Sequence, residues 1–364
     1  MYAFEPSDEQ KMLVDAISRY ANNDLRPKAH DAEEESQIPQ ALIDKGWELG
    51  LLQASIPEQY GGFGEHSSLT GVLAAEEMAF GDLAGALAVL TPGLFAIPLL
   101  LAGSEEQKQQ YLLPVIEAEW KPFTAALIES RFDFDPHDLA TNAQQQGDQY
   151  VISGEKVYVP YAAEAASLLV YARLEDQTQG FIVPAGTPGI EIGERQKLMG
   201  INALPVYSVK FNELHVPKAN RLGGETGHTF DPIIDAARVS LAAMAVGLSR
   251  AAFEYARDYA KDRDVFGMKV AQKQAIAFML AEMATEIEAI RLLTWEAAWM
   301  IDKGNTDAGK QAYLAHIGAT DMAMMVTDRA VQVLGGHGYI REHPVELWMR
   351  NGRGIATLTG LAIL

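Results

Sequence analysis

The sequence of 364 residues contains no cysteine. It therefore has no disulfide, no thiolate nucleophile and no cysteine-ligated zinc site. Basic residues are also scarce, because 29 lysines and arginines stand against 49 aspartates and glutamates, and the formal net charge is −20. A surface field of this sign repels nucleic acid and anionic lipid. Nucleic acid is therefore not an expected partner.

Signals for metal binding, export and membrane insertion are also missing. The eight histidines show no paired ligand spacing such as H-E-x-x-H, so no metal site is expected. The first residues, MYAFEPSDEQ, lack the basic-then-apolar order of a signal peptide, and the expected location is the cytoplasm. One uncharged run, Leu83 to Gly103, is long enough to cross a bilayer, but Pro92, Gly93 and Pro98 interrupt it. A buried pair of short helices is expected there, not a membrane span.

Apolar residues make up 48% of the chain and charged residues 21%, which is typical of a folded globular protein with a large core. The hydrophobic period changes twice. Helical spacing comes first, with Ser7 and Gln10 in a capping box ahead of Leu13 and Ile17. The expected fold is mainly α with a middle β domain. Its domains are an N-terminal helical domain (1–121), a β domain (122–231) and a C-terminal helical bundle (232–364).

The β domain is predicted from short apolar or alternating runs between turn residues. These runs are residues 150–160, 167–173, 180–185 and 205–214. In the last third, an apolar stripe at helical spacing precedes Gly304, where the helix is expected to end. The stripe consists of Ile276, Leu280, Met283, Ile287 and Ile290.

Four stretches resemble motifs of the acyl-CoA dehydrogenase family, in the family's order. They are PEQYGGFG (57–64), GSEEQKQQYLLP (103–114), RDVFGMKVAQKQAIAFMLAEMA (263–284) and AVQVLGGHGYIREHPVELWMR (330–350). The resemblance spans nearly the whole chain. It implies an N-terminal helical domain, a β-barrel-like domain and a four-helix bundle, with FAD held between the β domain, the bundle and a neighbouring subunit. The implied reaction removes the α-proton of an acyl-CoA by a carboxylate and the β-hydrogen as hydride to the flavin.

The resemblance also implies cofactor-binding residues. Arg263, Phe266 and Gln274 match the residues that hold the pyrophosphate and adenosine half of a neighbour's FAD. A guanidinium suits a diphosphate, and an amide suits a ribose or adenine edge. An interhelical turn with a surface arginine is the simpler alternative. A second group, in which bare backbone lets the dinucleotide approach, matches the family's Q-x-x-G-G-x-G at Gln332, Gly335, Gly336 and Gly338.

The expected substrate contacts lie on the first helix of the bundle. Asp235 and Arg238 match an Asp-x-x-Arg pair that lines the acyl-CoA channel in relatives. Their spacing places both on one helix face, so an ordinary helical salt bridge explains them equally well.

The catalytic base of the family is missing. Where the family has an aromatic residue, Glu, Gly and then Thr or Ser, this chain reads Leu358-Thr359-Gly360-Leu361. A threonine hydroxyl does not serve as a general base near neutral pH. Some relatives carry the Glu directly before the arginine that matches Arg238, but Ala237 stands there. No catalytic residue is therefore assigned.

The middle domain departs from the family as well. Ile128 replaces a Thr that hydrogen-bonds the flavin ring in relatives, and Phe134 replaces a Ser near the thioester. Pro160 replaces a Thr and offers neither a hydroxyl nor an N–H group. The residues for this chain's own flavin ring are thus changed, whereas those for a neighbour's FAD remain.

The leading hypothesis is a subunit of a heteromeric, FAD-dependent acyl-CoA dehydrogenase of the kind that acts on steroid side chains or other bulky acyl-CoAs in lipid or steroid catabolism. Its expected partners are a paralogous subunit in a heterotetramer, or copies of itself in a homodimer or homotetramer, together with acyl-CoA and electron-transfer flavoprotein. One alternative is a self-sufficient flavoenzyme in which Glu129, Tyr161, His337 or an arginine acts in altered chemistry, as in relatives that eliminate sulfite or hydroxylate. Another is an FAD-free acyl-CoA-binding or scaffold protein.

Overall fold

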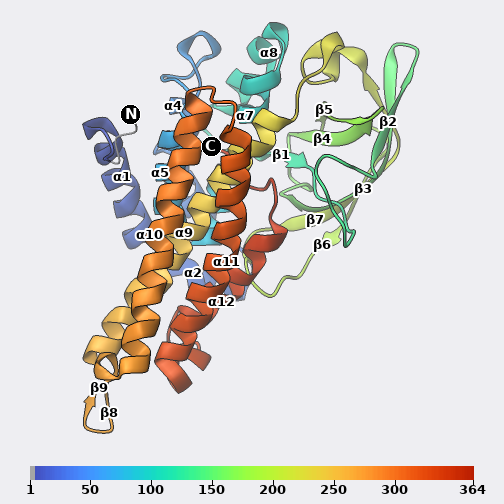
Figure 1. The fold of residues 1–364 in the computed structure, drawn as a ribbon. Helices are drawn as coiled ribbons and strands as arrows, with labels where there is room; N and C mark the ends of the chain where they lie inside the picture. Colours follow the sequence, from blue (N-terminus) through green and yellow to red (C-terminus); the bar gives the residue numbers. More distant parts are fainter. Residues whose placement is uncertain (1–4) are drawn as a thin grey trace.

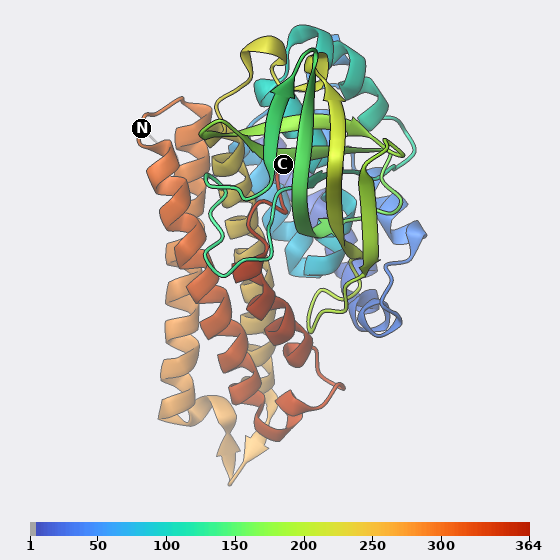
Figure 2. The ribbon, with the colours of Figure 1, turned by 90° about the vertical axis from the view of Figure 1, so that its right-hand side faces the viewer.

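The computed structural model describes residues 5–364, which form a helical region, a sheet and a second helical region in chain order (Figure 1). Seen from the side of the sheet, the strands lie in front of the N-terminal helices, and the long C-terminal helices stand beside them (Figure 2). The predicted fold, with a helical domain, a middle β domain and a C-terminal helical domain, is confirmed.

The N-terminal region begins as the sequence predicts. Ser7 Oγ accepts a hydrogen bond from the Gln10 N–H at 3.2 Å, and Gln10 Oε1 accepts one from the Ser7 N–H at 2.9 Å, which completes the capping box of α1. The helices of this region are α1 (Asp8–Tyr20), the π-helical turn η1 (Ala21–Leu25), α2 (Arg26–Glu35), α3 (Gln40–Trp47), α4 (Leu51–Ala54), α5 (Ser68–Gly81), α6 (Leu83–Leu90), α7 (Gly93–Ala102) and α8 (Glu105–Val115).

The uncharged run is a buried pair of helices, as expected. Helices α6 and α7 are bent by 51° relative to each other, and almost every residue in them is buried. Among residues 5–364, α9 (Asp231–Asp262) is the one helix that is by itself long and apolar enough to span a membrane, but 83% of its apolar window is buried inside the protein. It is the central helix of the molecule, and it packs against α5, α7, α10 and α11.

The middle region is a mixed sheet in the order β1-β4-β2-β3-β7-β6, with β5 beside β4. Strand β4 pairs in parallel with β1 and β2, and the other neighbours are antiparallel. The sheet is a half-barrel with its own small core. The strands are β1 (Phe123–Ala126), β2 (Asn142–Gln146), β3 (Gln149–Pro160), β4 (Ser167–Leu174), β5 (Gln177–Pro184), β6 (Ile190–Arg195) and β7 (Val206–Pro217).

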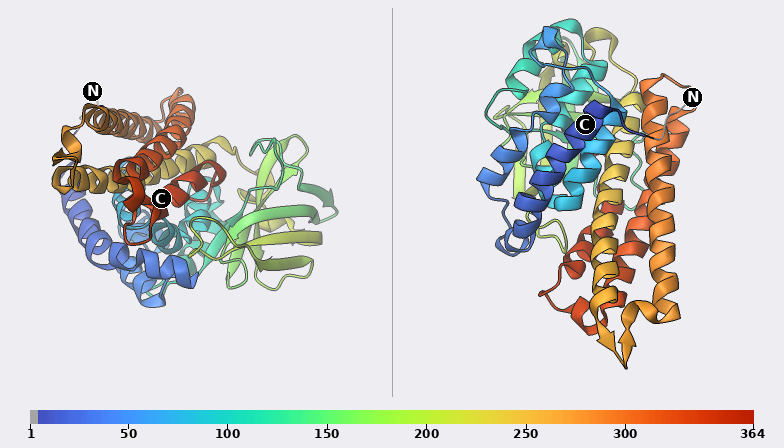
Figure 3. Two further views of the ribbon diagram at one scale, coloured as in Figure 1. Left: turned by 90° about the horizontal axis from the view of Figure 1, so that it is seen from below. Right: turned by 90° about the vertical axis from the view of Figure 1, so that its left-hand side faces the viewer.

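The third region consists of α9, α10 (Gln274–Asp302), α11 (Ala308–Leu334) and the ten-residue α12 (Val345–Gly354). Viewed from below, these helices and the N-terminal helices form one body, and the sheet stands beside it, at the right of the view (Figure 3, left). A short hairpin, β8 (Asp264–Val265) and β9 (Met268–Lys269), joins α9 to α10 at the tip of the bundle. The 3₁₀ turns are η2 (Glu58–Tyr60), η3 (Lys218–Asn220), η4 (Gly224–Thr226), η5 (Val270–Gln272), η6 (Gly335–Tyr339) and η7 (Ile355–Thr357).

The predicted stripe on α10 is confirmed in part. Met283, Ile287 and Ile290 are buried, whereas Ile276 and Leu280 are only partly covered. The helix ends at Asp302, and Gly304 follows with a φ of 60°. A glycine adopts this left-handed conformation without the cost that a side chain would add.

Candidate functional site

A cavity of about 500 Å³ lies between the sheet and the segment that follows α12. We call it the sheet–bundle cavity. Its walls come from the loop after β1, from the end of β3 and from the last turn of the chain. The lining residues are Ile128, Glu129, Ser130, Arg131, Phe132, Phe134, Val157, Tyr158, Gln196, Ala356, Thr357 and Thr359.

A bulge in β3 shapes one wall of this cavity. The pairing of β3 with β7 shifts register between Lys156 and Val159, and Tyr158 has a φ of 54° at this point. The Tyr158 N–H donates to Gln196 Oε1 at 3.1 Å instead of to a strand neighbour. Bulges of this kind redirect side chains and are frequent beside active sites. Here the bulge brings Tyr158 to the cavity.

Thr359 lines the sheet–bundle cavity, as its match to the position of the family's base implies. It is half-buried, and its hydroxyl forms no hydrogen bond with any residue in the described range 5–364. No aspartate lines the cavity, and Glu129 is the only glutamate that does.

The Glu129 carboxylate is already fully engaged. It accepts hydrogen bonds from the N–H groups of Ala140 at 2.7 Å and Thr141 at 2.8 Å, and from Lys156 Nζ at 2.9 Å. Burial alone would raise the pKa of Glu129, but Lys156 and the two N–H groups hold it below its usual value. Glu129 therefore stays ionised in a structural ion pair and is a poor proton acceptor.

The four residues after Gly360 turn into the protein interior. Leu361, Ala362, Ile363 and Leu364 are each less than 5% exposed. We call residues 361–364 the tail. The Leu364 N–H donates to Ser240 Oγ on α9 at 3.2 Å. On the other side, a Cβ added to Gly71 of α5 would lie 2.4 Å from the Leu364 carbonyl oxygen. The tail is thus wedged between α5 and α9.

Little space remains beside the tail. The apolar cavity that Ile363 lines together with Leu127, Ile234 and Ala237 has a volume of about 10 Å³. This volume is about the minimum that one water molecule requires. The interior on the bundle side of Gly360 is therefore filled by the chain's own side chains.

Asp235 and Arg238 lie on a different face of α9 from Ala237. Arg238 Nη1 is 2.9 Å from Asp235 Oδ1, and the guanidinium lies 5.2 Å from the centre of the Tyr313 ring on α11. Burial raises the pKa of Asp235, and Arg238 opposes this shift. Burial and the nearby Arg238 lower the pKa of His316 to about 4. The structure thus brings the pair together as a helical salt bridge, and its contact with acyl-CoA stays a prediction.

The first three predicted cofactor residues meet at the tip of the bundle, far from the sheet (Figure 1). Arg263 follows the last residue of α9, Phe266 lies at the tip of the hairpin and Gln274 begins α10; all three are exposed. Phe266 has a φ of 54° and is 93% exposed. Its ring lies 5.5 Å from Lys273 Nζ.

The glycine-rich turn η6 lies against the same end of α9. The Tyr259 hydroxyl and His337 Nδ1 are 2.8 Å apart, which ties the turn to the last part of α9. Gly335 and Gly336 are exposed, and a Cβ on either would meet no atom within 4 Å. A Cβ on Gly338 would lie 2.4 Å from the Val331 carbonyl oxygen, so this position requires glycine.

We call these seven predicted residues the distal clamp. They are Arg263, Phe266, Gln274, Gln332, Gly335, Gly336 and Gly338. Within residues 5–364, the Arg263 guanidinium has no hydrogen bond and no ion pair. An exposed guanidinium without an ion pair and exposed glycine backbone at the same end of α9 both suit a phosphate-bearing ligand.

The helical–β–helical order, the cavity between sheet and bundle and the glycine-rich turn at the end of α11 agree with the fold that the sequence resemblance implies. Comparisons with known proteins agree. The acyl-CoA dehydrogenase N-terminal domain model matches residues 7–119, the middle domain model matches residues 125–214 and the C-terminal domain model matches residues 231–361. The chain belongs to the acyl-CoA dehydrogenase family, whose cofactor is FAD.

Individual relatives match over nearly the full length. The mitochondrial short-chain specific acyl-CoA dehydrogenase of Sus scrofa is 34% identical over 358 residues, which cover 96% of this chain and 86% of the relative. The caffeyl-CoA reductase-Etf complex subunit CarC of Acetobacterium woodii is 34% identical and covers 95% and 93%. The solved structure of butyryl-CoA dehydrogenase from Megasphaera elsdenii superposes with a TM-score of 0.88 at 30% identity, covering 100% of this chain and 96% of that one.

Proposed function

We propose that this chain is a subunit of a heteromeric, FAD-dependent acyl-CoA dehydrogenase that lacks its own catalytic base. In this proposal its distal clamp holds the pyrophosphate and adenosine half of an FAD whose flavin ring lies in a partner subunit. The observation that carries the proposal is the lining of the sheet–bundle cavity. Thr359 occupies the position that matches the family's base, and Glu129, the one glutamate in the lining, forms an ion pair with Lys156.

The filled interior supports the same conclusion. An acyl chain in this subunit would need an apolar channel beside Thr359, but the tail and the side chains around Ala237 leave a cavity of only about 10 Å³. Removal of an α-proton needs both a base and a bound thioester. This chain provides neither on its own, so the partner subunit would bind the acyl-CoA and supply the carboxylate.

The distance between the two sites supports a role across an interface. Ala237 lies near the start of α9 and Arg263 follows its end, and at a rise of about 1.5 Å per residue the two are roughly 40 Å apart along the helix. Helix α9 is continuous between them. The distal clamp and the sheet–bundle cavity of one chain are therefore too far apart to hold one and the same cofactor molecule.

Exposed apolar side chains near the clamp and on the bundle support a partner chain. Phe266, Phe278 and Tyr339 are 93%, 60% and 87% exposed. Tyr313, Leu314 and Ile317 on α11 are each more than 40% exposed. Apolar surface of this kind is covered in most assembled proteins. We propose that a paralogous subunit covers it; a second copy of this chain is the other candidate.

Each clamp residue has a chemical role in this proposal. FAD, when bound, supplies the electron sink that accepts hydride. The Arg263 guanidinium would bind the pyrophosphate, and the amides of Gln274 and Gln332 would hydrogen-bond the adenosine. The bare backbone of Gly335 and Gly336 would allow the phosphates to approach closely. None of these residues takes part in proton transfer.

The alternative of a self-sufficient flavoenzyme has less support, because the residues that would have to act in its chemistry are engaged elsewhere or lie outside the sheet–bundle cavity. Glu129 is engaged by Lys156, and His337 is bound to Tyr259 at the distal end of the bundle. Tyr161 does not line the sheet–bundle cavity, because its side chain enters a separate groove. The FAD-free scaffold is the remaining alternative, and cofactor content distinguishes it from the other two.

The acceptor of electrons is also a proposal. We propose electron-transfer flavoprotein, because one relative, 34% identical, is described as a subunit of a caffeyl-CoA reductase-Etf complex. A chain from a solved structure that is named for the electron-transferring flavoprotein of Acidaminococcus fermentans shares 32% sequence identity with this chain and superposes on it with a TM-score of 0.87.

Flavin content tests the proposal. The chain is purified alone and together with the products of neighbouring genes, and flavin absorbance per chain is measured with the native mass. About one FAD per unlike pair, with little in the chain alone, is the expected result. One FAD per chain in a homo-oligomer would support the self-sufficient enzyme instead. No FAD under either condition would support the scaffold.

A further inference from the structure

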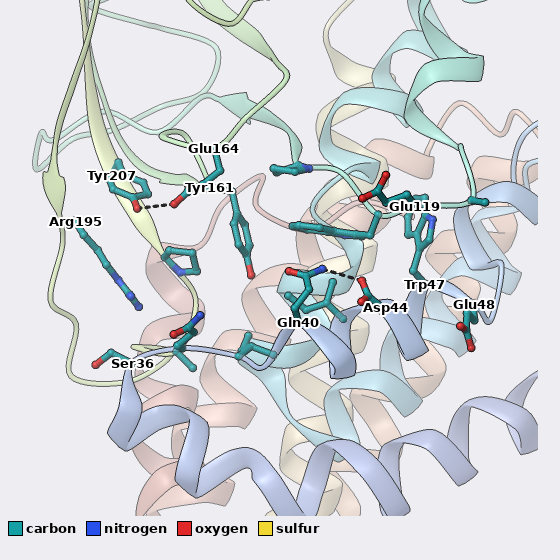
Figure 4. Close-up of a pocket in the computed structure, with 18 residues that line it drawn as sticks. Ser36, Gln40, Asp44, Trp47, Glu48, Glu119, Tyr161, Glu164, Arg195 and Tyr207 are labelled. Carbon is teal, nitrogen blue, oxygen red and sulfur yellow. Dashed lines mark hydrogen bonds between the residues drawn. The ribbon is translucent and has the colours of Figure 1, made fainter.

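A second pocket lies between α3 and the sheet, and it shares no lining residue with the sheet–bundle cavity. We call it the α3 groove. Its volume is about 720 Å³, within the range of small-molecule sites. Figure 4 shows that its walls come from α3, from the loop before β1, and from the turn after β3 and the strand β7.

Negative charge dominates this groove. Asp44, Glu48, Glu119 and Glu164 line it, and Arg195 is the only cationic side chain among the lining residues. Arg195 forms no ion pair with another residue in the described range; its Nη2 donates to the Asn202 carbonyl at 2.6 Å. The groove therefore favours a ligand that carries positive charge.

Two of these four carboxylates each accept one hydrogen bond from the protein, and the other two accept none. Asp44 accepts from Gln40 Nε2 at 2.8 Å, and Glu164 accepts from the Tyr207 hydroxyl at 3.2 Å. By contrast, the side chains of Glu48 and Glu119 form no hydrogen bond or ion pair with any residue from 5 to 364.

Tyr161 supplies an independent indication of a ligand. Only 9% of this residue is exposed, and its ring packs edge-on against Trp120 with the centroids 5.1 Å apart. Its hydroxyl points into the groove (Figure 4) and has no hydrogen-bond partner in the described part of the chain. Burial raises the pKa of Tyr161 well above its usual value, so the hydroxyl stays protonated. The ring is thus held in the protein interior while the hydroxyl stays open to a ligand in the groove.

The backbone holds Tyr161 in this direction. Its φ is 51°, which is uncommon for an aromatic residue, and its N–H donates to the Pro205 carbonyl at 2.9 Å. The side chain is therefore fixed toward the groove by the β3 turn and β7.

We propose that the α3 groove binds a linear aliphatic amine with two or more ammonium groups. The carboxylates occur along the groove, with Glu164 toward one end and Glu48 toward the other (Figure 4), so one extended ligand could pair with several of them. The Tyr161 oxygen would accept a hydrogen bond from an ammonium group, and the rings of Trp47 and Trp120 would cover methylene groups.

A divalent metal fits less well. No group of three or more histidine, aspartate or glutamate side chains among residues 5–364 is arranged to hold a metal ion. The inference does not depend on the proposed heteromeric function. The α3 groove and the sheet–bundle cavity are nevertheless adjacent along the chain. Arg195 lines the groove, and the next residue, Gln196, lines the cavity and accepts a hydrogen bond from the Tyr158 N–H.

Isothermal titration of the full chain with spermidine at constant ionic strength tests this proposal. We expect saturable binding of one spermidine per chain. Asp44→Asn combined with Glu119→Gln should weaken binding at least tenfold, and Tyr161→Phe should weaken it several-fold. All three changes are conservative in shape, and Asp44 and Glu119 are exposed, so circular dichroism should show an unchanged fold.

A matched control separates a site from general charge attraction. Glu9→Gln combined with Asp15→Asn removes the same number of charges from the exposed face of α1, away from the groove. This pair should leave spermidine binding unchanged. Equal weakening in the two double variants would mean that spermidine binds as a diffuse counter-ion to a chain of charge −20 and would overturn the proposal. Absence of saturable binding would overturn it too.

Discussion

Lys156 and Glu129 show how single residues shape the candidate site. Lys156 is fully buried, and its ammonium group lies 2.9 Å from both Glu129 Oε1 and the Leu127 carbonyl. Burial lowers the pKa of Lys156 to about 8, and Glu129 opposes that shift. The pair joins β3 to the loop that forms the opposite wall of the sheet–bundle cavity.

Glu129→Gln should therefore destabilise the protein strongly. It leaves the buried Lys156 ammonium without its counter-charge, and breaking a buried pair from one side costs about 3–5 kcal/mol. Urea unfolding at pH 7 measures the loss. Glu129→Gln combined with Lys156→Met removes both charges and should recover most of the stability. A loss below about 1 kcal/mol in the single variant would show that the pair is not the structural link described here.

The sequence singles out the residues of the distal clamp and Thr359 because they belong to short motifs whose spacing is fixed locally, and their roles stay predictions. The engagement of Glu129 and the direction of Tyr161 could not be predicted. Both depend on the β3 segment, where Tyr158 and Tyr161 adopt positive φ values that no local pattern indicates. The pairing of β3 with β7 imposes this geometry.

At the scale of elements, the strands with apolar alternation were predictable, and the polar or very short ones were not. β3, β4, β5 and β7 follow the predicted runs closely. β1 has only four residues, β2 is NAQQQ and β6 is largely exposed. These three are strands because of their neighbours in the sheet, which a single sequence does not reveal.

The buried tail makes a prediction at this scale. Gly71→Ala should displace it, because the new Cβ would lie 2.4 Å from the Leu364 carbonyl oxygen. Overpacking of this kind costs about 1–3 kcal/mol. Hydrogen exchange of residues 355–364 should become faster. Gly354→Ala is the control, since a Cβ there meets no atom within 4 Å. Unchanged exchange in Gly71→Ala would contradict the placement of the tail.

The cap of α6 makes a pH-dependent prediction. Burial raises the pKa of Asp82 to about 6 from 3.8, although the Gly85 N–H donates to its carboxylate at 2.7 Å. The folded state thus favours protonated Asp82. Its stabilising contribution is complete below about pH 3.8 and is lost as the pH rises through 6.

Asp82→Asn keeps a capping acceptor and removes this titration. Relative to the wild type, the variant should have nearly equal stability at pH 4 and should be more stable at pH 8, by about 1–3 kcal/mol. Denaturant midpoints at the two pH values measure the difference. A variant that is equally destabilised at both would show that the Asp82 carboxylate is needed as an ionised cap.

At the scale of the whole molecule, the N-terminal and C-terminal helices share one core, with α9 at its centre, and the sheet attaches to one side. The sequence predicted the order of these regions because hydrophobic periodicity is local. It did not predict that the tail would fill the interior beside Ala237, since that contact joins the end of the chain to α5 and α9. The distal clamp lies far from the sheet because α9, which runs between the two, is 32 residues long.

The most direct test of the account concerns Arg263 in the complex of this chain with the proposed partner subunit. Arg263→Ala in this chain alone should weaken FAD binding by the complex at least tenfold, while the native mass stays the same. Arg257→Ala, six residues earlier on α9, removes a guanidinium that is paired with Asp258 and should have no effect. If the Arg263→Ala complex and the wild-type complex bind FAD equally well, the result would contradict the central claim that this chain binds the pyrophosphate and adenosine half of a partner's FAD.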